Sequence, residues 1–215
     1  DVKTFLDMIE KVGFAVSTDE TRYILTGMYM QGVDGELVMV GTDGFRMALC
    51  RRKIKEMKGF KGVTIPKRSV IEAERIIEEE DEVKISIEEK YVQFSTEKLK
   101  IITRVIEGNF PDYENVLPSD NPKTVRIEKE SFHRGLKRAS AIIGRSEPIK
   151  ITFSDKKMEI EAESDIGRAK EDLEIEYEGE RTSMSFNVRF ILDVVTHITG
   201  EKLIMTAPTA YGAVL

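Results

Sequence analysis

Hydrophobic residues recur along this chain at two different spacings. Phe5, Ile9 and Val12 lie three or four residues apart, as on one buried face of a helix, so the pattern predicts a helix over residues 2–14. The same spacing returns later in the chain, and Pro66 suits a helix start because proline is tolerated in a first turn. The further helices are expected at residues 67–79, 129–143 and 188–198.

Between the helices, apolar and polar residues alternate, which predicts short antiparallel strands. Asp43-Gly44 is the strongest turn signal, because this dipeptide separates the apolar run 36–40 from the alternating residues 45–49. We therefore expect two strands joined by a tight turn with Asp43-Gly44 at its apex. In chain order the expected strands are residues 23–31, 35–41, 45–53, 62–65, 83–88, 91–95 and 99–105, then 124–127, 149–153, 157–162, 168–177, 182–186, 202–206 and 210–215.

Residues 106–123 show neither spacing and contain three prolines, which is typical of a linker between domains. The order helix, strands, helix, strands occurs on both sides of this segment. The sequence therefore predicts an α+β protein of two similar domains, in which antiparallel sheets pack helices on one face. We expect the domains at residues 1–116 and 117–215, the first without the strand that opens the second, and the second without its last residues.

The amino-acid composition limits which kinds of functional site the chain can contain. A single cysteine, Cys50, excludes an internal disulfide and fits a reducing cytoplasm. Two histidines and one cysteine provide no zinc cluster, and no glycine-rich phosphate cradle is present, so we expect neither a metal nor a cofactor. No apolar run approaches the ~18 residues that span a bilayer, so we expect a cytoplasmic protein that does not bind a membrane. The net charge of −6 does not by itself indicate nucleic-acid binding.

Four stretches stand out by their order and spacing. They are Arg22-Tyr23-Ile24-Leu25-Thr26-Gly27-Met28, Thr42-Asp43-Gly44-Phe45-Arg46-Met47-Ala48, Phe110-Pro111-Asp112-Tyr113-Glu114-Asn115-Val116-Leu117-Pro118 and Phe186-Asn187-Val188-Arg189-Phe190-Ile191-Leu192-Asp193. With these stretches the chain resembles the second and third domains of the bacterial DNA polymerase III β subunit family, the sliding clamps. The resemblance implies the sliding-clamp (DNA clamp) fold.

The resemblance also implies a role without catalysis, as a processivity factor that encircles duplex DNA without sequence specificity. The complete subunit would form a head-to-tail homodimeric ring associated with the nucleoid. Its partners would be the replicative DNA polymerase subunit, the clamp loader and repair polymerases, which bind through short linear motifs. Residues 142–143 and the edge strand 168–177 would supply this chain's half of the ring contact, so the chain alone should be largely monomeric.

A groove between the two domains would receive a partner motif rich in Gln, Leu and Phe. Apolar walls would hold the Leu and Phe anchors, and a few polar groups would orient the peptide. Phe45 stands where the family often has His, and Asn115 where it often has Arg, so the rim should be less basic. The residues that the resemblance places in this groove are Leu25, Thr42, Gly44, Phe45, Arg46, Met47, Pro111, Asn115, Val116, Asn187, Phe190, Tyr211 and Ala213.

Basic residues off the apolar stripe of the expected helix 129–143 make it the best DNA-facing element. Contacts of this kind go to phosphates, so they position the protein without specifying a sequence. An acidic outer surface would keep DNA away from the outside of a ring, which fits the net charge of −6. The expected DNA-binding residues are Arg22, Tyr23, Lys67, Arg68, Arg134, Lys137 and Arg138.

The sequence leaves two other functions as alternatives. One is a carboxylate-dependent hydrolase that uses Asp43 and Asp112, but both residues stand at turn positions, which favour Asp for backbone reasons, and no nucleophile signature accompanies them. The other is an interaction module that uses the same groove and does not bind DNA.

Overall fold

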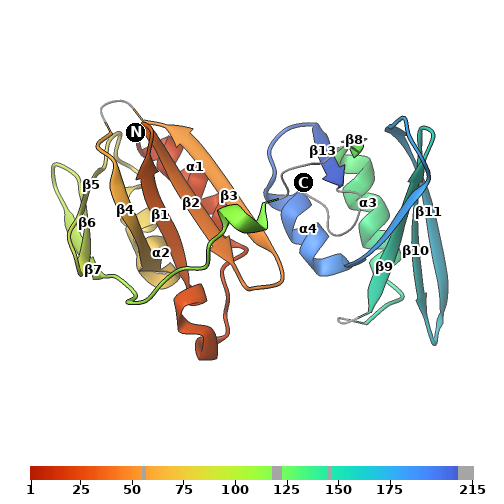
Figure 1. Ribbon diagram of the computed structural model, residues 1–215, viewed down its shortest axis with the longest axis horizontal. Helices are drawn as coiled ribbons and strands as arrows, with labels where there is room; N and C mark the ends of the chain where they lie inside the picture. The colour runs from red at the N-terminus through yellow and green to blue at the C-terminus, as the bar shows by residue number, and fades with distance from the viewer. Residues whose placement is uncertain (55–56, 118–122, 145–146, 208–215) are drawn as a thin grey trace. The chain divides into compact units, whose positions relative to one another are not determined.

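The computed structural model describes residues 1–54, 57–117, 123–144 and 147–207 (Figure 1). The chain divides into two compact units, Asp1–Glu114 and Asn115–Leu215. Each unit combines helices with antiparallel strands, as the α+β prediction requires.

The first unit contains two antiparallel sheets, one of four strands in the order β3-β2-β1-β4 and one of three in the order β5-β6-β7. Helix α1 packs on β2 and β3, and helix α2 packs on β4 and β1. The elements are α1 (Val2–Gly13), a 3-10 helix (Glu20–Thr26), β1 (Gly27–Val33), β2 (Glu36–Thr42), β3 (Met47–Lys53), β4 (Phe60–Pro66), α2 (Lys67–Ile77), β5 (Lys84–Ile87), β6 (Tyr91–Ser95) and β7 (Lys100–Arg104).

Helix α1 forms where its apolar stripe predicts it. Phe5, Ile9 and Val12 are buried together in the core of the first unit. The helix begins after Asp1, whose side chain accepts a hydrogen bond from the amide of Thr4 at 2.7 Å and so satisfies one of the unpaired donors of the first turn.

The face of the four-stranded sheet opposite the helices is also covered. Val38 and Val40 of β2 pack there against Tyr113, and Phe110 joins the same cluster. The rings of Tyr29 and Phe110 stack with their centroids 4.8 Å apart. The expectation of a linker over residues 106–123 is therefore wrong for its first part, because its aromatic residues find apolar partners on the sheet.

The second unit contains one sheet in the order β12-β9-β10-β11-β8-β13. Strands β11 and β8 pair only at Ile175 with Ile127 and at Glu176 with Arg126. Helices α3 and α4 pack on each other, and their buried residues share one core with the sheet. The elements are β8 (Lys123–Glu128), α3 (Lys129–Ser140), β9 (Pro148–Ser154), β10 (Lys157–Ser164), β11 (Gly167–Glu176), β12 (Thr182–Asn187), α4 (Val188–His197) and β13 (Lys202–Ala207), with a 3-10 turn at Glu114–Val116.

Two predicted strands are wrong at their starts. The expected strand 23–31 begins only at Gly27, because Asp19 caps a 3-10 helix by accepting from the amide of Thr21 at 3.0 Å. The expected strand 45–53 begins at Met47, because residues 43–46 form the loop between β2 and β3. Helices 67–79 and 129–143 end at Ile77 and Ser140, and the expected strand 210–215 lies outside the described residues.

Replacing Gly62 by Ala should destabilise the first unit. A Cβ at residue 62 would overlap the hydroxyl and ring of Tyr29, which is held in place by its stack on Phe110. We expect Gly62→Ala to lower the free energy of unfolding by about 1–3 kcal/mol, measured by urea denaturation. In a Tyr29→Ala background the overlap is gone, so the same substitution should then have little effect, and additive losses would contradict this account.

Candidate functional site

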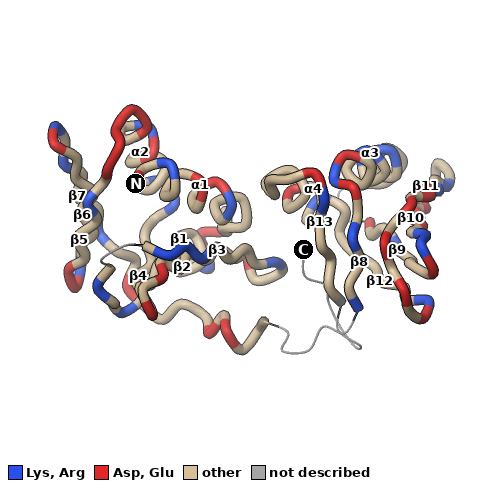
Figure 2. The backbone as a smooth tube through the Cα atoms, turned by 90° about the horizontal axis from the view of Figure 1, so that it is seen from above, with Lys and Arg blue, Asp and Glu red and all other residues tan. Residues whose placement is uncertain are grey.

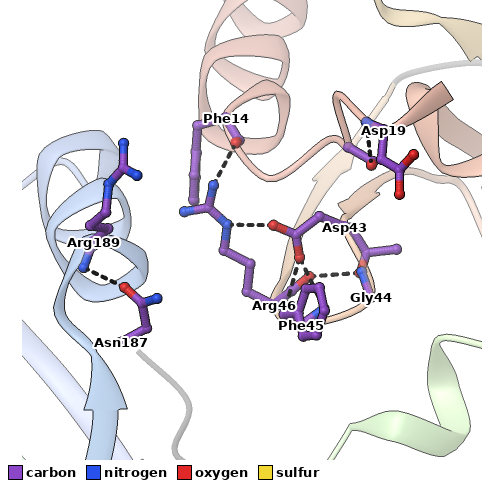
Figure 3. Close-up of polar contacts among 10 residues, drawn as sticks. Phe14, Asp19, Asp43, Gly44, Phe45, Arg46, Asn187 and Arg189 are labelled. Carbon is purple, nitrogen blue, oxygen red and sulfur yellow. Dashed lines mark hydrogen bonds and ion pairs between the residues drawn. The ribbon is translucent and has the colours of Figure 1, made fainter. Parts of the chain in front are cut away.

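The loop between β2 and β3 is held by its own side chains (Figure 3). The hydroxyl of Thr42 donates to the carbonyl of Arg46 at 2.6 Å and accepts from the amide of Gly44 at 3.0 Å. The carboxylate of Asp43 accepts from the amides of Phe45 and Arg46, at 2.9 and 3.0 Å. Gly44 has a φ of +85°, a conformation that strongly favours glycine. The loop is therefore preorganised, and Asp43 serves as its internal cap.

The side chain of Arg46 ties this loop to the end of α1. Its Nε lies 3.2 Å from Asp43 Oδ2, and its Nη2 donates to the carbonyl of Phe14 at 3.2 Å. The guanidinium also lies over the Phe14 ring, 5.4 Å from the centroid, and only 17% of the side chain is exposed. Figure 3 shows it directed at Phe14. Among the predicted groove residues, Arg46 thus has a clear supporting role within its own unit.

Phe45 presents an exposed aromatic ring at the tip of the loop. Phe45 is 74% exposed, whereas Leu25, which lies close to Gly44, is buried. The guanidinium of Arg22 lies over the Phe45 ring at 5.3 Å from the centroid. An exposed ring on a rigid loop is a suitable anchor point for apolar side chains of a partner.

Met47 and Pro111 lie at the sheet face opposite the helices, Met47 within the covered cluster and Pro111 beside it. Met47 is half-buried against the cluster that contains Val38 and Val40. Pro111 is exposed and helps line a cavity of about 230 Å³ with Tyr29 and Tyr113. Burial and the charge of Glu114 raise the pKa of Tyr29 and Tyr113 in this cavity. The other lining residues are Gln31, Phe110, Asp112 and Glu114.

The second unit places its predicted groove residues at the start of α4. Asn187 caps this helix, since its side-chain oxygen accepts from the amide of Arg189 at 3.0 Å, and Phe190 in the first turn is half-buried. Asn115 and Val116 are exposed in the short 3-10 turn. Tyr211 and Ala213 lie outside the described residues.

The predicted DNA-binding residues of the first unit lie on two elements. Arg22 and Tyr23 belong to the 3-10 helix, where the Tyr23 hydroxyl donates to the carbonyl of Glu107 at 2.8 Å. Lys67 and Arg68 open α2. Burial lowers the pKa of Lys67 from its ordinary value, and the charge of Arg46 lowers it further.

Three predicted DNA-binding cations lie on α3, which carries blue segments in Figure 2, and they differ in their surroundings. Arg134 lies 3.6 Å from Glu130 on the same helix. Arg138 makes two hydrogen bonds to Glu171 of β11, at 2.8 and 2.6 Å, and hydrogen bonding to Arg138 lowers the pKa of Glu171. Lys137 forms no ion pair with another described residue. Lys137 is therefore the α3 cation most available to a phosphate.

Phe14 and Asp19 also support the site, although the sequence prediction did not include them. Asp19 accepts from both the amide and the hydroxyl of Thr21, and it pairs with Arg22 at 3.4 Å. The spacing Asp19-x-Thr21 is a signal for such a turn and could have been recognised. The partnership of Phe14 with Arg46 spans 32 residues and leaves no local signal.

Two negative findings concern the described part of the chain only. It contains no group of three or more His, Cys, Asp or Glu side chains that could hold a metal ion. Within the same residues, no helix combines the length and apolar character required to cross a membrane.

Solved structures show which class of protein has this fold. A beta sliding clamp from C. crescentus matches with a TM-score of 0.91 at 31% sequence identity, over 96% of this chain and 57% of that chain. A DNA polymerase III subunit beta from Pseudomonas aeruginosa matches with a TM-score of 0.90 at 26% sequence identity, over 96% of this chain and 58% of that chain. The predicted sliding-clamp fold is confirmed.

Sequence comparison gives the family. The central domain of the DNA polymerase III beta subunit matches residues 1–112, and its C-terminal domain matches residues 114–212. The Beta sliding clamp of Caulobacter vibrioides is 34% identical over 216 residues, covering 94% of this chain and 56% of the relative. The Beta sliding clamp of Staphylococcus aureus is 28% identical over 207 residues, covering 94% of this chain and 55% of the relative. The chain belongs to the DNA polymerase III beta subunit family, and it spans just over half the length of these curated relatives.

Replacing Lys67 by Gln should stabilise the first unit. The lowered pKa means that the fold disfavours the charged form of Lys67. This destabilisation is present below the folded-state pKa and is lost as the pH rises past the unfolded value of about 10.5. We expect Lys67→Gln to raise the free energy of unfolding by less than about 1 kcal/mol at pH 7, since the side chain is only half-buried. Above a pH of about 10.5, the substitution should leave this free energy unchanged. Arg68→Gln changes the neighbouring, exposed residue and is the matched control. Its free energy of unfolding should lie within about 0.5 kcal/mol of that of the wild type. If thermal denaturation shows that Lys67→Gln is less stable than the wild type, the fold does not disfavour the charged form of Lys67.

Proposed function

We propose that this chain supplies the central and C-terminal domains of a DNA sliding clamp. The observation that carries the proposal is the match of both domains, in order, to clamp relatives in sequence and in structure. In this proposal the complete subunit is a non-catalytic processivity factor of a DNA polymerase, acting as a head-to-tail homodimeric ring around duplex DNA. It tethers the replicative polymerase, the clamp loader and repair polymerases.

Under this proposal the domains meet near residues 116 and 117, and the protein acts in the cytoplasm on the nucleoid. The division of the chain into compact units at Glu114 and Asn115 supports that boundary. The ring contact is proposed at residues 142–143 and along β11. Strand β11 pairs with β8 at only two positions, so most of that edge is unpaired with a described strand and could pair with another chain.

Partners are proposed to bind a groove that combines the loop Thr42–Met47 with residues of the second domain, Tyr211 and Ala213 among them. The exposed Phe45 ring and the rigid loop beneath it support this assignment. The carboxylate of Asp43 holds two loop amides and Arg46, which favours a supporting role over the hydrolase alternative.

DNA is proposed to lie along the helices, where its phosphates contact basic side chains on α2, α3 and the 3-10 helix. Lys67 supports this assignment, because burial and the charge of Arg46 both lower its pKa, and such perturbed basic groups are frequent at functional sites. The net charge of −6 is compatible with such contacts, since a closed ring needs little intrinsic affinity to stay on DNA.

Replacing Phe45 by Ala should abolish most of the partner binding. The probe is a fluorescently labelled peptide with Gln, Leu and Phe anchors, titrated with the 215-residue chain and followed by anisotropy. We expect at least roughly a tenfold loss of affinity, as for a central aromatic hot spot. Because the side chain is 74% exposed, stability should change little. The control is Ile102→Ala, an exposed apolar residue on β7 (60% exposed), which should bind as the wild type does. Equal binding by both variants would exclude Phe45 from the groove.

Replacing Lys137 by Gln should weaken DNA binding more than replacing Arg138 by Gln. The charge of Arg138 is already neutralised by Glu171, while Lys137 has no such partner among the described residues. We expect Lys137→Gln to lower affinity for duplexes of any sequence and to reduce the slope of log K against log salt by about 1. Filter binding at several salt concentrations measures both. A chain that binds no duplex at low salt would favour the interaction module that does not bind DNA.

A further inference from the structure

We propose that the contact between Arg22 and Phe45 is a latch that couples DNA binding to partner binding. This inference rests on the proposed function, which assigns Arg22 to the DNA-facing surface and Phe45 to the partner groove. It adds that the two surfaces share one contact and that both ligands break it.

The latch is built from two elements of the first unit. Arg22 belongs to the 3-10 helix Glu20–Thr26 and departs from helical geometry there, with φ −107° and ψ 57°. Its guanidinium lies over the Phe45 ring at 5.3 Å and 3.4 Å from the carboxylate of Asp19. Gly44 makes the approach possible, because a Cβ at that position would lie 2.7 Å from Arg22 Nη1.

Each ligand requires one half of this contact. An apolar anchor of a partner peptide needs the face of the Phe45 ring that the guanidinium covers. A DNA phosphate competes with Asp19 and with the ring for the guanidinium, and it offers a charged bidentate acceptor in place of a π face. The Arg22 side chain is 42% exposed and Phe45 is 74% exposed, so both can be reached from solvent.

A contact that two ligands both break makes their binding cooperative. Peptide releases Arg22 for a phosphate, and DNA uncovers Phe45 for peptide, and by linkage the two effects are equal in size. A cation–π contact at an exposed site corresponds to roughly a two- to fivefold change in affinity. The clamp would thus hold a partner more tightly when DNA lies against the latch.

The decisive variant is Arg22→Gln, which removes the cation that covers Phe45. In the absence of DNA we expect it to bind the labelled Gln-Leu-Phe peptide roughly two- to fivefold more tightly than the wild type. A side chain that merely supported the loop would give weaker binding when removed. Adding a short duplex at low salt should tighten peptide binding to the wild type by the same factor and leave the variant unchanged.

Two further variants separate the latch from general charge effects. Phe45→Leu keeps an apolar side chain without a π face, so its peptide affinity should no longer respond to DNA. Arg134→Gln removes a proposed DNA contact that pairs only with Glu130 among the described residues, so DNA affinity should fall while the coupling persists. Thermal denaturation establishes that each variant is folded.

Three outcomes would overturn the latch. Peptide affinity could fall or stay the same in Arg22→Gln without DNA, or the wild type could bind peptide equally with and without duplex. If the wild type binds neither ligand, the proposed function fails and the latch fails with it. If both ligands bind but independently, the proposed function stands and only the latch is wrong.

Discussion

Strand β2 is buried on both faces, and much of the first unit is arranged to meet that constraint. Leu37 and Met39 face the helices, while Val38 and Val40 face away from them. The second face must therefore be covered, and the segment that carries Phe110 and Tyr113 covers it. The end of β2 is thereby fixed from both sides, which gives the Thr42–Arg46 loop a rigid base. Pro111 is held beside the same sheet by the same packing.

The cations of the site differ more in their partners than in their type. Arg46 is largely buried and ties the loop to α1, and Arg138 is neutralised by Glu171. Lys67 is half-buried near Arg46 with a lowered pKa, and Lys137 has no ionic partner among the described residues. Arg22 is shared between a carboxylate and an aromatic ring. The availability of each charge to an outside phosphate follows from these contacts rather than from the presence of a basic residue.

Periodicity located the four helices and most strands, because burial of one face is a local property that repeats at 3.6 or 2 residues. It failed where side chains cap the backbone. Asp19 turns residues 20–26 into a 3-10 helix, and Asp43 with Thr42 holds a loop that makes β3 begin two residues later than predicted, at Met47. It also failed at residues 106–113, where Gly108 and Pro111 indicate a linker, but the rings of Phe110 and Tyr113 pack on β1 and β2.

The sequence by itself determined the fold class, the family and the chemical character of the proposed site. Spacing of apolar residues and four ordered motifs are properties of the chain that need no third dimension. Tertiary structure alone decided which motif residues are exposed and which are structural, as in the contrast between Phe45 and Arg46. It also decided that Glu171 neutralises Arg138 and that Arg22 covers Phe45. These contacts join residues 33 and 23 positions apart, which no local pattern brings together, and their energies depend on the geometry that folding imposes.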